Sequence, residues 1–271
     1  MRWLPSGDMG GVSSGYTGSQ KAHALGAQEF TLDLAPWMIA AVAAIVVLGS
    51  IVQSGLGMGF GLMVAPLLAL LDPALVPAPT LFLGMFTAAW GAFGDRGLIR
   101  WNEVAIASFG RFTGVAAGLV LLFFVAGEAG FSLLFGVMVL AAVFLSVAGR
   151  ALPFNRLSLA SMGIVSGTMG TITSVGAPPM ALIYHGRAPS EARASLAAFF
   201  AIGCAGSLFG LYAAGWAGIQ DLALAVAMLP PMLLGLWLAR YFRLRFAKWY
   251  RPWLLSVAGL AGLLLVARGL L

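Results

Sequence analysis

Long apolar runs separated by short polar loops dominate the chain from residue 36 onward. A helix needs about 20 mostly apolar residues to cross a bilayer. Two runs are interrupted by stretches rich in Gly, Ser and Thr. The first, Pro36–Leu71, is too long for one crossing, and the second, Leu157–Tyr184, is too short for two. The ordinary runs, each predicted to cross once, are Pro79–Gly94, Val104–Ala126, Phe131–Gly149, Ala194–Ala214, Leu222–Ala239 and Trp253–Ala267.

The two interrupted runs resemble each other. SGLGMGFGLMVAPLLAL (54–70) aligns without gaps on SGTMGTITSVGAPPMAL (166–182). Each run opens a half in which three ordinary runs follow, and this order predicts an internal duplication, as in many transporters. We expect a first membrane repeat over 36–150 and a second over 151–271. Residues 1–35 are rich in Gly and Ser, lack a signal-peptide pattern, and are predicted to form a disordered tail.

Basic residues distinguish two topologies, because Lys and Arg are enriched in cytoplasmic loops. If each interrupted run crossed once, the loop basic residues would divide four against seven. If each is a re-entrant hairpin, all eleven lie on one side, and Asp72, Glu128 and Asp221 lie on the other. The eleven are Arg96, Arg100, Arg150, Arg156, Arg187, Arg193, Arg240, Arg243, Arg245, Lys248 and Arg251.

The second topology predicts an all-α polytopic membrane protein built from two inverted repeats. Each repeat is a broken or re-entrant helical hairpin followed by three transmembrane helices. The hairpins enter from opposite sides, so we expect their tips to meet near the middle of the membrane. Pro36–Ser54 is long enough to cross fully, which leaves open whether the first hairpin is re-entrant.

Composition supports the membrane class and excludes several functions. Hydrophobic residues make up 61% of the chain and charged residues 9%, far from the roughly 25% charged residues of a soluble domain. The net charge of +6 is carried by short loops, which indicates topology rather than nucleic-acid binding. The single Cys204 allows neither a disulfide nor a dithiol electron relay. We expect no cofactor and no bound metal.

The hairpin tips are the predicted site for a small anion. Pro66 and the pair Pro178–Pro179 follow the two loops, and proline is favoured in the first turn of a helix. Free N–H groups and the positive dipole end at such a terminus bind anions. Hydroxyl groups suit sulfite or sulfonate oxygens, although small residues also serve ordinary helix packing. The candidate residues are Ser54, Gly55, Gly57, Gly59, Gly61, Ser166, Gly167, Thr168, Thr171, Thr173, Ser174 and Gly176.

Three residues outside the loops join the candidate site. Arg111 is the one basic residue inside an ordinary apolar run, and an intramembrane charge is costly. Counted from Val104 it lies about 10 Å deep at 1.5 Å per residue, which leaves open both a substrate role and snorkelling to the interface. Thr80 and Ser195 lie near the start of the crossing after each hairpin, either along the path or at the interface.

The two loop regions resemble the TauE/SafE sulfite exporter family. SGLGMGFGLMVAPLLALLDPALVPAPT is similar to the glycine-rich start of that family's first repeat, and SGTMGTITSVGAPPMALIYHGRAPSEARAS to the start of its second. The resemblance covers about residues 40–266. It implies export of sulfite or of organosulfonates such as sulfoacetate across a bacterial inner membrane, with the paired loops in the permeation site. Met58 stands where a further glycine is more usual, so the substrate is left open.

The leading hypothesis is that the protein, embedded in the lipid bilayer, exports a small anion. A membrane potential of 100 mV, negative inside, favours export of one negative charge by about 2.3 kcal/mol. A passive channel and an importer of the same anion stay open, as does a homo-oligomer. An intramembrane enzyme using Ser166 and His185 is disfavoured, because these residues would lie at different depths of the hairpin. A scaffold would not need two matched broken helices.

Overall fold

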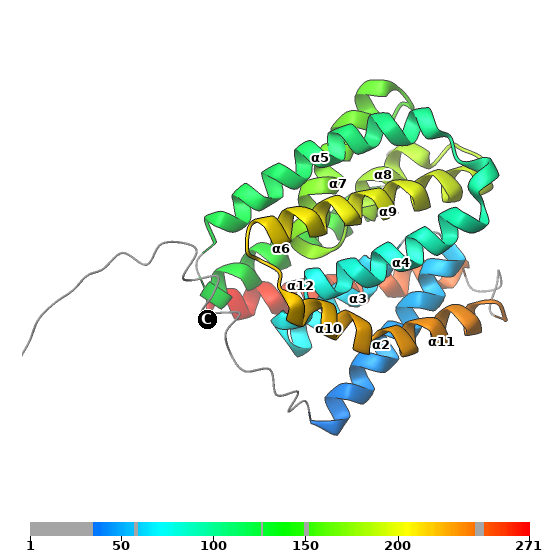
Figure 1. Ribbon diagram of the computed structural model, residues 1–271. Coiled ribbons are helices and arrows are strands. Elements are labelled where there is room, and N and C mark those ends of the chain that lie inside the picture. The colour runs from blue at the N-terminus through cyan, green and yellow to red at the C-terminus, as the bar shows by residue number, and fades with distance from the viewer. Residues whose placement is uncertain (1–34, 57–58, 126, 149–151, 242–246) are drawn as a thin grey trace, which may run out of the picture.

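The computed structural model describes residues 35–271 apart from 57–58, 126, 149–151 and 242–246, and these residues form a helical bundle (Figure 1). The predicted tail up to residue 34 and the candidate Gly57 lie outside the described residues. The α-helices are α2 (Pro36–Leu56), α3 (Phe60–Leu71), α4 (Ala78–Gly94), α5 (Trp101–Phe123), α6 (Gly127–Ala148), α7 (Arg156–Thr173), α8 (Ala177–Tyr184), α9 (Pro189–Ala213), α10 (Ile219–Ala227), α11 (Leu229–Ala239) and α12 (Ala247–Leu270), with short 3-10 turns at Pro73–Leu75 and Arg96–Leu98.

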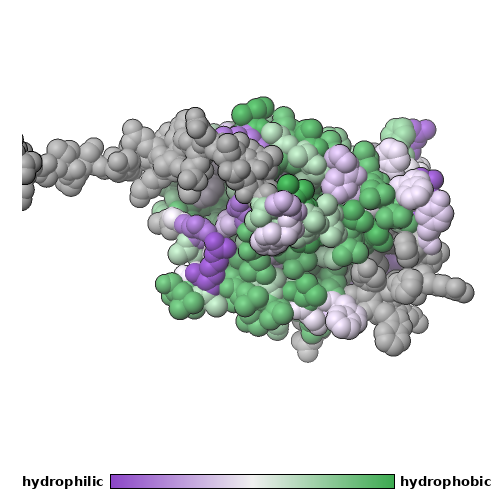
Figure 2. All heavy atoms as spheres, turned by 90° about the horizontal axis from the view of Figure 1, so that it is seen from below, coloured by the Kyte–Doolittle hydropathy of each residue, from purple (hydrophilic) through white to green (hydrophobic). Residues whose placement is uncertain are grey.

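The chain is a multi-pass membrane protein. Within the described ranges, six helices are long and apolar enough to cross a bilayer, and the bent pair α10–α11 would make a seventh. Large apolar side chains also cover the outside: Trp90, Phe109 and Phe209 are 73%, 76% and 78% exposed. Hydrophobic residues cover most of the described part of the face in Figure 2. Such a surface suits lipid rather than water.

Helices of the first half pair with helices of the second. The most extensive interfaces join α5 to α7, α6 to α12, α4 to α9 and α2 to α11, while α3 also packs on α12. In Figure 1, α4, α5 and α9 run side by side. The two halves are therefore interlocked rather than separate lobes.

The α5–α7 interface is a backbone contact made possible by glycine. A Cβ atom on Gly110 would lie 2.0 Å from the Ala160 carbonyl oxygen, and one on Gly114 would lie 2.0 Å from that of Ile164. Gly167 of α7 meets the backbone of α5 in the same way. Later residues of α5 meet later residues of α7, so the two helices run parallel. Small residues four apart allow this close approach in lipid.

Helices α5, α7 and α9 all begin at one end of the bundle, which we call the basic end. Three interhelical ion pairs join its loops, and the Leu152 N–H donates to the Leu182 carbonyl at 3.0 Å. The chain before α7 therefore lies beside the end of α8, so the α7–α8 hairpin returns to the end where it starts. The ion pairs are Arg100–Glu191 (2.8 Å), Arg193–Asp95 (2.8 Å) and Arg187–Glu103.

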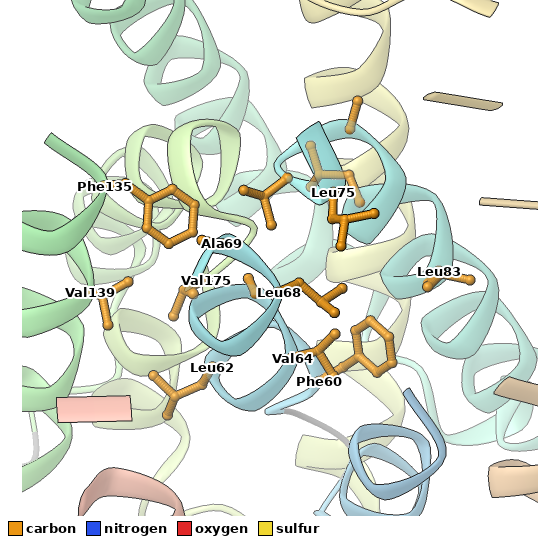
Figure 3. Packing of buried hydrophobic residues seen from close by; sticks show 14 of the residues in the cluster. Phe60, Leu62, Val64, Leu68, Ala69, Leu75, Leu83, Phe135, Val139 and Val175 are labelled. Atoms are coloured by element: carbon orange, nitrogen blue, oxygen red, sulfur yellow. The ribbon is translucent and has the colours of Figure 1, made fainter. Parts of the chain in front are cut away.

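The predicted meeting of the two broken segments is confirmed by a contact between them. A Cβ atom on Gly61, at the start of α3, would lie 1.9 Å from the Ser174 carbonyl oxygen at the end of α7. Figure 3 shows α3 at the centre of the apolar cluster, with Val175 of the second segment on the same side of α3 as Leu62 and Ala69. Burial of α3 on all sides covers its interrupted backbone, as a membrane interior requires.

Two predictions about the helices are wrong. Pro66 was expected in the first turn of the returning helix, but α3 begins six residues earlier at Phe60 and holds Pro66 in its interior. The run Leu222–Ala239 was expected to be one uninterrupted crossing, but it is divided into α10 and α11, which are bent by 42° and pass the test for a crossing only as a pair. Pro230 and Pro231 explain the bend, because they cannot donate the hydrogen bonds that would continue α10.

The first interrupted segment is also less symmetric than predicted. Pro36–Ser54 passes the length and hydropathy test for a crossing on its own, whereas α3 is shorter than one. The second segment has no such crossing, since α7 is rich in Gly, Ser and Thr. The re-entrant description therefore fits α7–α8 better than α2–α3.

Substitution of Gly114 by Ala should test the backbone contact. The added methyl group would overlap the Ile164 carbonyl, and we expect a loss of about 1–3 kcal/mol in stability, as for other overpacked interiors. The matched control is Gly94→Ala, because nothing lies within 4 Å of a Cβ there. Alanine favours a helix over glycine by up to about 1 kcal/mol, so this variant should melt at the same temperature or higher. The measurement is the melting temperature of each purified variant. An equal shift in both variants would contradict the backbone contact between α5 and α7.

Candidate functional site

Arg111 is buried at the centre of the bundle, with 1% of its surface exposed. It is the eleventh of the 23 residues of α5, so it lies about 15 Å along the helix, half the thickness of a hydrocarbon core. The sequence-based depth was too small because α5 begins at Trp101, before Val104. The snorkelling alternative for Arg111 is therefore wrong.

The Arg111 charge has few polar partners. Its Nη1 donates to the Ser166 hydroxyl at 3.0 Å, and Ser166 donates in turn to the Gly176 carbonyl at 2.6 Å. Within the described residues, Nε has no hydrogen-bond partner, and none of the four ion pairs includes Arg111. The guanidinium carbon lies 5.0 Å and 5.6 Å from the ring centroids of Phe199 and Phe200, within cation–π range.

Glycines from three segments form the walls around the guanidinium. Cβ atoms on Gly170 and Gly176 would lie 3.1 Å and 3.0 Å from its terminal nitrogens, and one on Gly203 would lie 1.7 Å from Nε. These residues belong to the end of α7, the start of α8 and the middle of α9. Any side chain at Gly203 would therefore displace Arg111.

The start of α8 supplies the second polar element near Arg111. Pro178 and Pro179 lie in its first turn, as predicted, with Gly176 as N-cap. Prolines have no N–H, so this terminus offers fewer free donors than an ordinary helix. The positive charge near the second hairpin therefore comes mainly from Arg111, with α8 contributing its dipole and the Gly176 and Ala177 amides.

Most predicted hydroxyl groups are bonded inside the protein rather than free. Ser174 donates to the Pro77 carbonyl at 3.0 Å, which ties the tip of α7 to the start of α4. The others on α7 donate to carbonyls or, for Thr171, also share a bond with another hydroxyl. The pairs are Thr168 with Gly114 and Ile164 (both 3.1 Å), Thr171 with Gly167 (2.8 Å) and Ser207 (2.9 Å), and Thr173 with Met169 (2.7 Å).

The first loop lies at the tip contact rather than at Arg111. Gly59 is the N-cap of α3 with φ of 113°, a backbone conformation that favours glycine. The Phe60 N–H in the first turn of α3 donates to the buried Gln53 side chain at 3.0 Å, so it is not free. Gly61 contacts Ser174, while Ser54 and Gly55 belong to the last turn of α2.

The two residues predicted near the ends of crossings have structural partners. Thr80 is buried and donates to the carbonyls of Leu75 (3.3 Å) and Pro77 (3.1 Å). Ser195 accepts the Arg100 N–H at 3.0 Å, at the basic end. There the adjacent Glu191 carboxylate raises the pKa of the exposed Arg100 guanidinium through their hydrogen bond.

The structure thus brings together Arg111, Ser166, Gly167 and Gly176 among the predicted residues. It adds Gly170, Phe199, Phe200 and Gly203, which sequence reasoning missed. The spacing of Gly110, Gly114 and Gly118 would have indicated that α5 packs tightly against a partner, and hence that Arg111 faces protein. Nothing in the sequence indicated that α9, in addition to α7, packs against Arg111.

Comparison with known proteins gives one match. A model of the family described as sulfite exporter TauE/SafE matches residues 41–265, which is most of the chain. Neither the curated proteins nor the solved structures contain a match. The match covers the second broken segment, the first from residue 41 onward, and every predicted site residue.

Replacement of Arg111 by Met should separate a binding role from a structural one. Met keeps the length of the side chain but removes a buried charge whose desolvation costs several kcal/mol. We expect the melting temperature without added anions not to fall, and a gain of about 1 kcal/mol in stability would raise it by about 2 °C. The matched control is Arg96→Met at an exposed arginine, which should leave it unchanged. A large fall for Arg111→Met alone would indicate that the guanidinium holds the helices together.

Proposed function

The chain belongs to the TauE/SafE sulfite exporter family, whose members are membrane transporters rather than enzymes, and we propose that it exports sulfite or an organosulfonate. The proposed binding site lies at the membrane midplane, between Arg111 of α5, the α7–α8 break and α9. We further propose the bacterial inner membrane as its location. The observation that carries the site is the buried Arg111, whose charge has no counter-ion among the described residues.

An unpaired charge at this depth supports binding of an anion. A buried cation without a partner is costly, and in membrane proteins such residues commonly mark ion pathways. The anion would supply the missing counter-charge and an acceptor for the Nε donor. The start of α8 places its positive dipole end beside the same position.

One polar side chain, Ser108, lies between the basic end and Arg111. Ser108 lies one turn before Arg111 on the same side of α5, and its buried hydroxyl has no hydrogen-bond partner among the described residues. The Arg187–Glu103 pair and Tyr184, whose hydroxyl donates to Glu103 at 3.4 Å, lie at the basic end. We infer that the anion enters from this end, past the ion pair, and leaves toward the opposite side.

The closed surroundings of Arg111 favour a carrier over an open channel. With 1% of its surface exposed, the residue is shut off from water at both ends in this conformation. Transport would then require movement of the helices that surround Arg111. The membrane potential would drive export by about 2.3 kcal/mol per negative charge at 100 mV.

Helix pairing supports the proposed inverted duplication of 36–150 and 151–271. Under that correspondence α4 matches α9 and α6 matches α12, and both pairs pack antiparallel, with Gly84 near Cys204 and Gly91 near Ala197. The α5–α7 interface corresponds to α11–α2, and α3–α12 corresponds to α8–α6, both of which are present. Equivalent helices of inverted repeats are expected to run in opposite directions.

Cysteine labelling should test the re-entrant α7–α8 hairpin. On a Cys204→Ala background, Arg156→Cys and His185→Cys should both react with an impermeant thiol reagent from the cytoplasmic face, because both positions are exposed at the basic end. Glu128→Cys, exposed at the opposite end, should react only from outside. Labelling of positions 156 and 185 from opposite faces would contradict the hairpin.

Proteoliposome flux should test the proposed substrate class. Purified protein should carry sulfite or isethionate down a gradient, faster with the potential set to favour anion movement, whereas Arg111→Met should lose at least about tenfold in rate. Arg96→Met serves as the control and should retain flux. Equal flux through both variants would remove Arg111 from the pathway, and the absence of flux for all sulfur anions would contradict the proposed function.

A further inference from the structure

We propose that the Arg111 site selects anions with a single negative charge, such as hydrogensulfite and monosulfonates, over dianions such as sulfate, sulfite and sulfoacetate. This inference rests on the proposed function, because it concerns the substrate of the same site. It follows from a count of the charges that surround Arg111.

The site holds one formal positive charge. Within the described interior, Arg111 is the only charged side chain among the buried residues. Arg100, Arg187 and Arg193 are paired with carboxylates at the basic end, and Arg268 is paired with Glu128 at the opposite end. None of them therefore contributes a free charge at the depth of Arg111.

The uncharged donors near Arg111 are few. Ser166 uses its single hydroxyl proton on the Gly176 carbonyl while it accepts from Arg111, so it has no proton left for a ligand. A complete helix N-terminus is equivalent to about half a positive charge, and Pro178 and Pro179 remove two of the donors that create it here. Thr171, which follows Gly170 on α7, is already bonded to Gly167 and Ser207.

The balance of charge then favours a monoanion. A monoanion against Arg111 gives a neutral pair, whereas a dianion leaves one uncompensated negative charge among Phe199, Phe200 and glycine backbone. The free-energy cost of moving an ion from water into an apolar interior rises with the square of its charge, so this cost is about four times as large for a dianion. Only a second cation would offset the desolvation cost of the second negative charge, and the described residues around Arg111 include none.

Isethionate and sulfoacetate form a matched pair for the test. Both are two-carbon sulfonates of similar size, and they differ in carrying a hydroxyl or a second anionic group. Titration of thermal stabilisation of the purified full-length protein gives an apparent Kd for each. We expect isethionate to bind at least about tenfold more tightly than sulfoacetate, a preference that Arg111→Met should abolish. Methanesulfonate against sulfate repeats the comparison with smaller anions.

Sulfite provides a second, independent readout, since it converts from monoanion to dianion near neutral pH. Its stabilising effect should weaken as the pH rises from about 6 to about 8, while that of isethionate, which keeps one charge, should not change.

Three outcomes are distinguishable. A preference for isethionate together with the pH-dependent loss for sulfite supports selection by charge. Equal or tighter binding of sulfoacetate and sulfate overturns the charge selection but leaves a sulfur-anion site standing. If no sulfonate and no form of sulfite stabilises the protein, the proposed function fails and the inference fails with it.

Discussion

The buried guanidinium of Arg111 is the constraint around which this bundle is organised. A lone cation in the middle of a membrane protein is costly, so the surrounding protein must partly solvate it without cancelling it. One serine hydroxyl, two aromatic faces and three glycine backbones provide that environment. Each neighbour interacts with a cation but carries no formal negative charge, so the positive charge of Arg111 is not cancelled.

Glycine and serine in the broken segments serve this constraint in a different way from the one the sequence suggested. The hydroxyls of Thr168, Thr171 and Thr173 donate to backbone carbonyls of α5 and α7, so these polar side chains near the helix break are not left unpaired. The glycines of α5 and α7 bring two helix backbones into contact and so fix the depth at which Arg111 meets Ser166. The loop residues therefore build the site more than they line it.

The parts of the fold predicted from sequence were those set by local composition. Apolar runs of crossing length, the two interruptions and the contact between their tips followed from hydropathy, Gly-rich loops and internal similarity. The start of α3 was wrong because Pro66 was taken as a helix start, although proline is also tolerated within a buried helix. The bend at Met228 was present in the sequence as Pro230–Pro231 but was overlooked. The environment of Arg111 could not be predicted, because Phe199, Phe200 and Gly203 reach it only through the packing of α9.

The interlocked pairing of the two halves has a consequence for biosynthesis. Helices α2 to α6 leave the ribosome before any of α7, α9, α11 and α12, which are their main packing partners. Until then the glycine face of α5 and the charge of Arg111 lie against lipid or the insertion machinery instead of protein. The first half must therefore wait in the membrane as loosely associated helices. Completion of the second half is then the step that encloses the charge, so the environment of Arg111 and the compact structure form together.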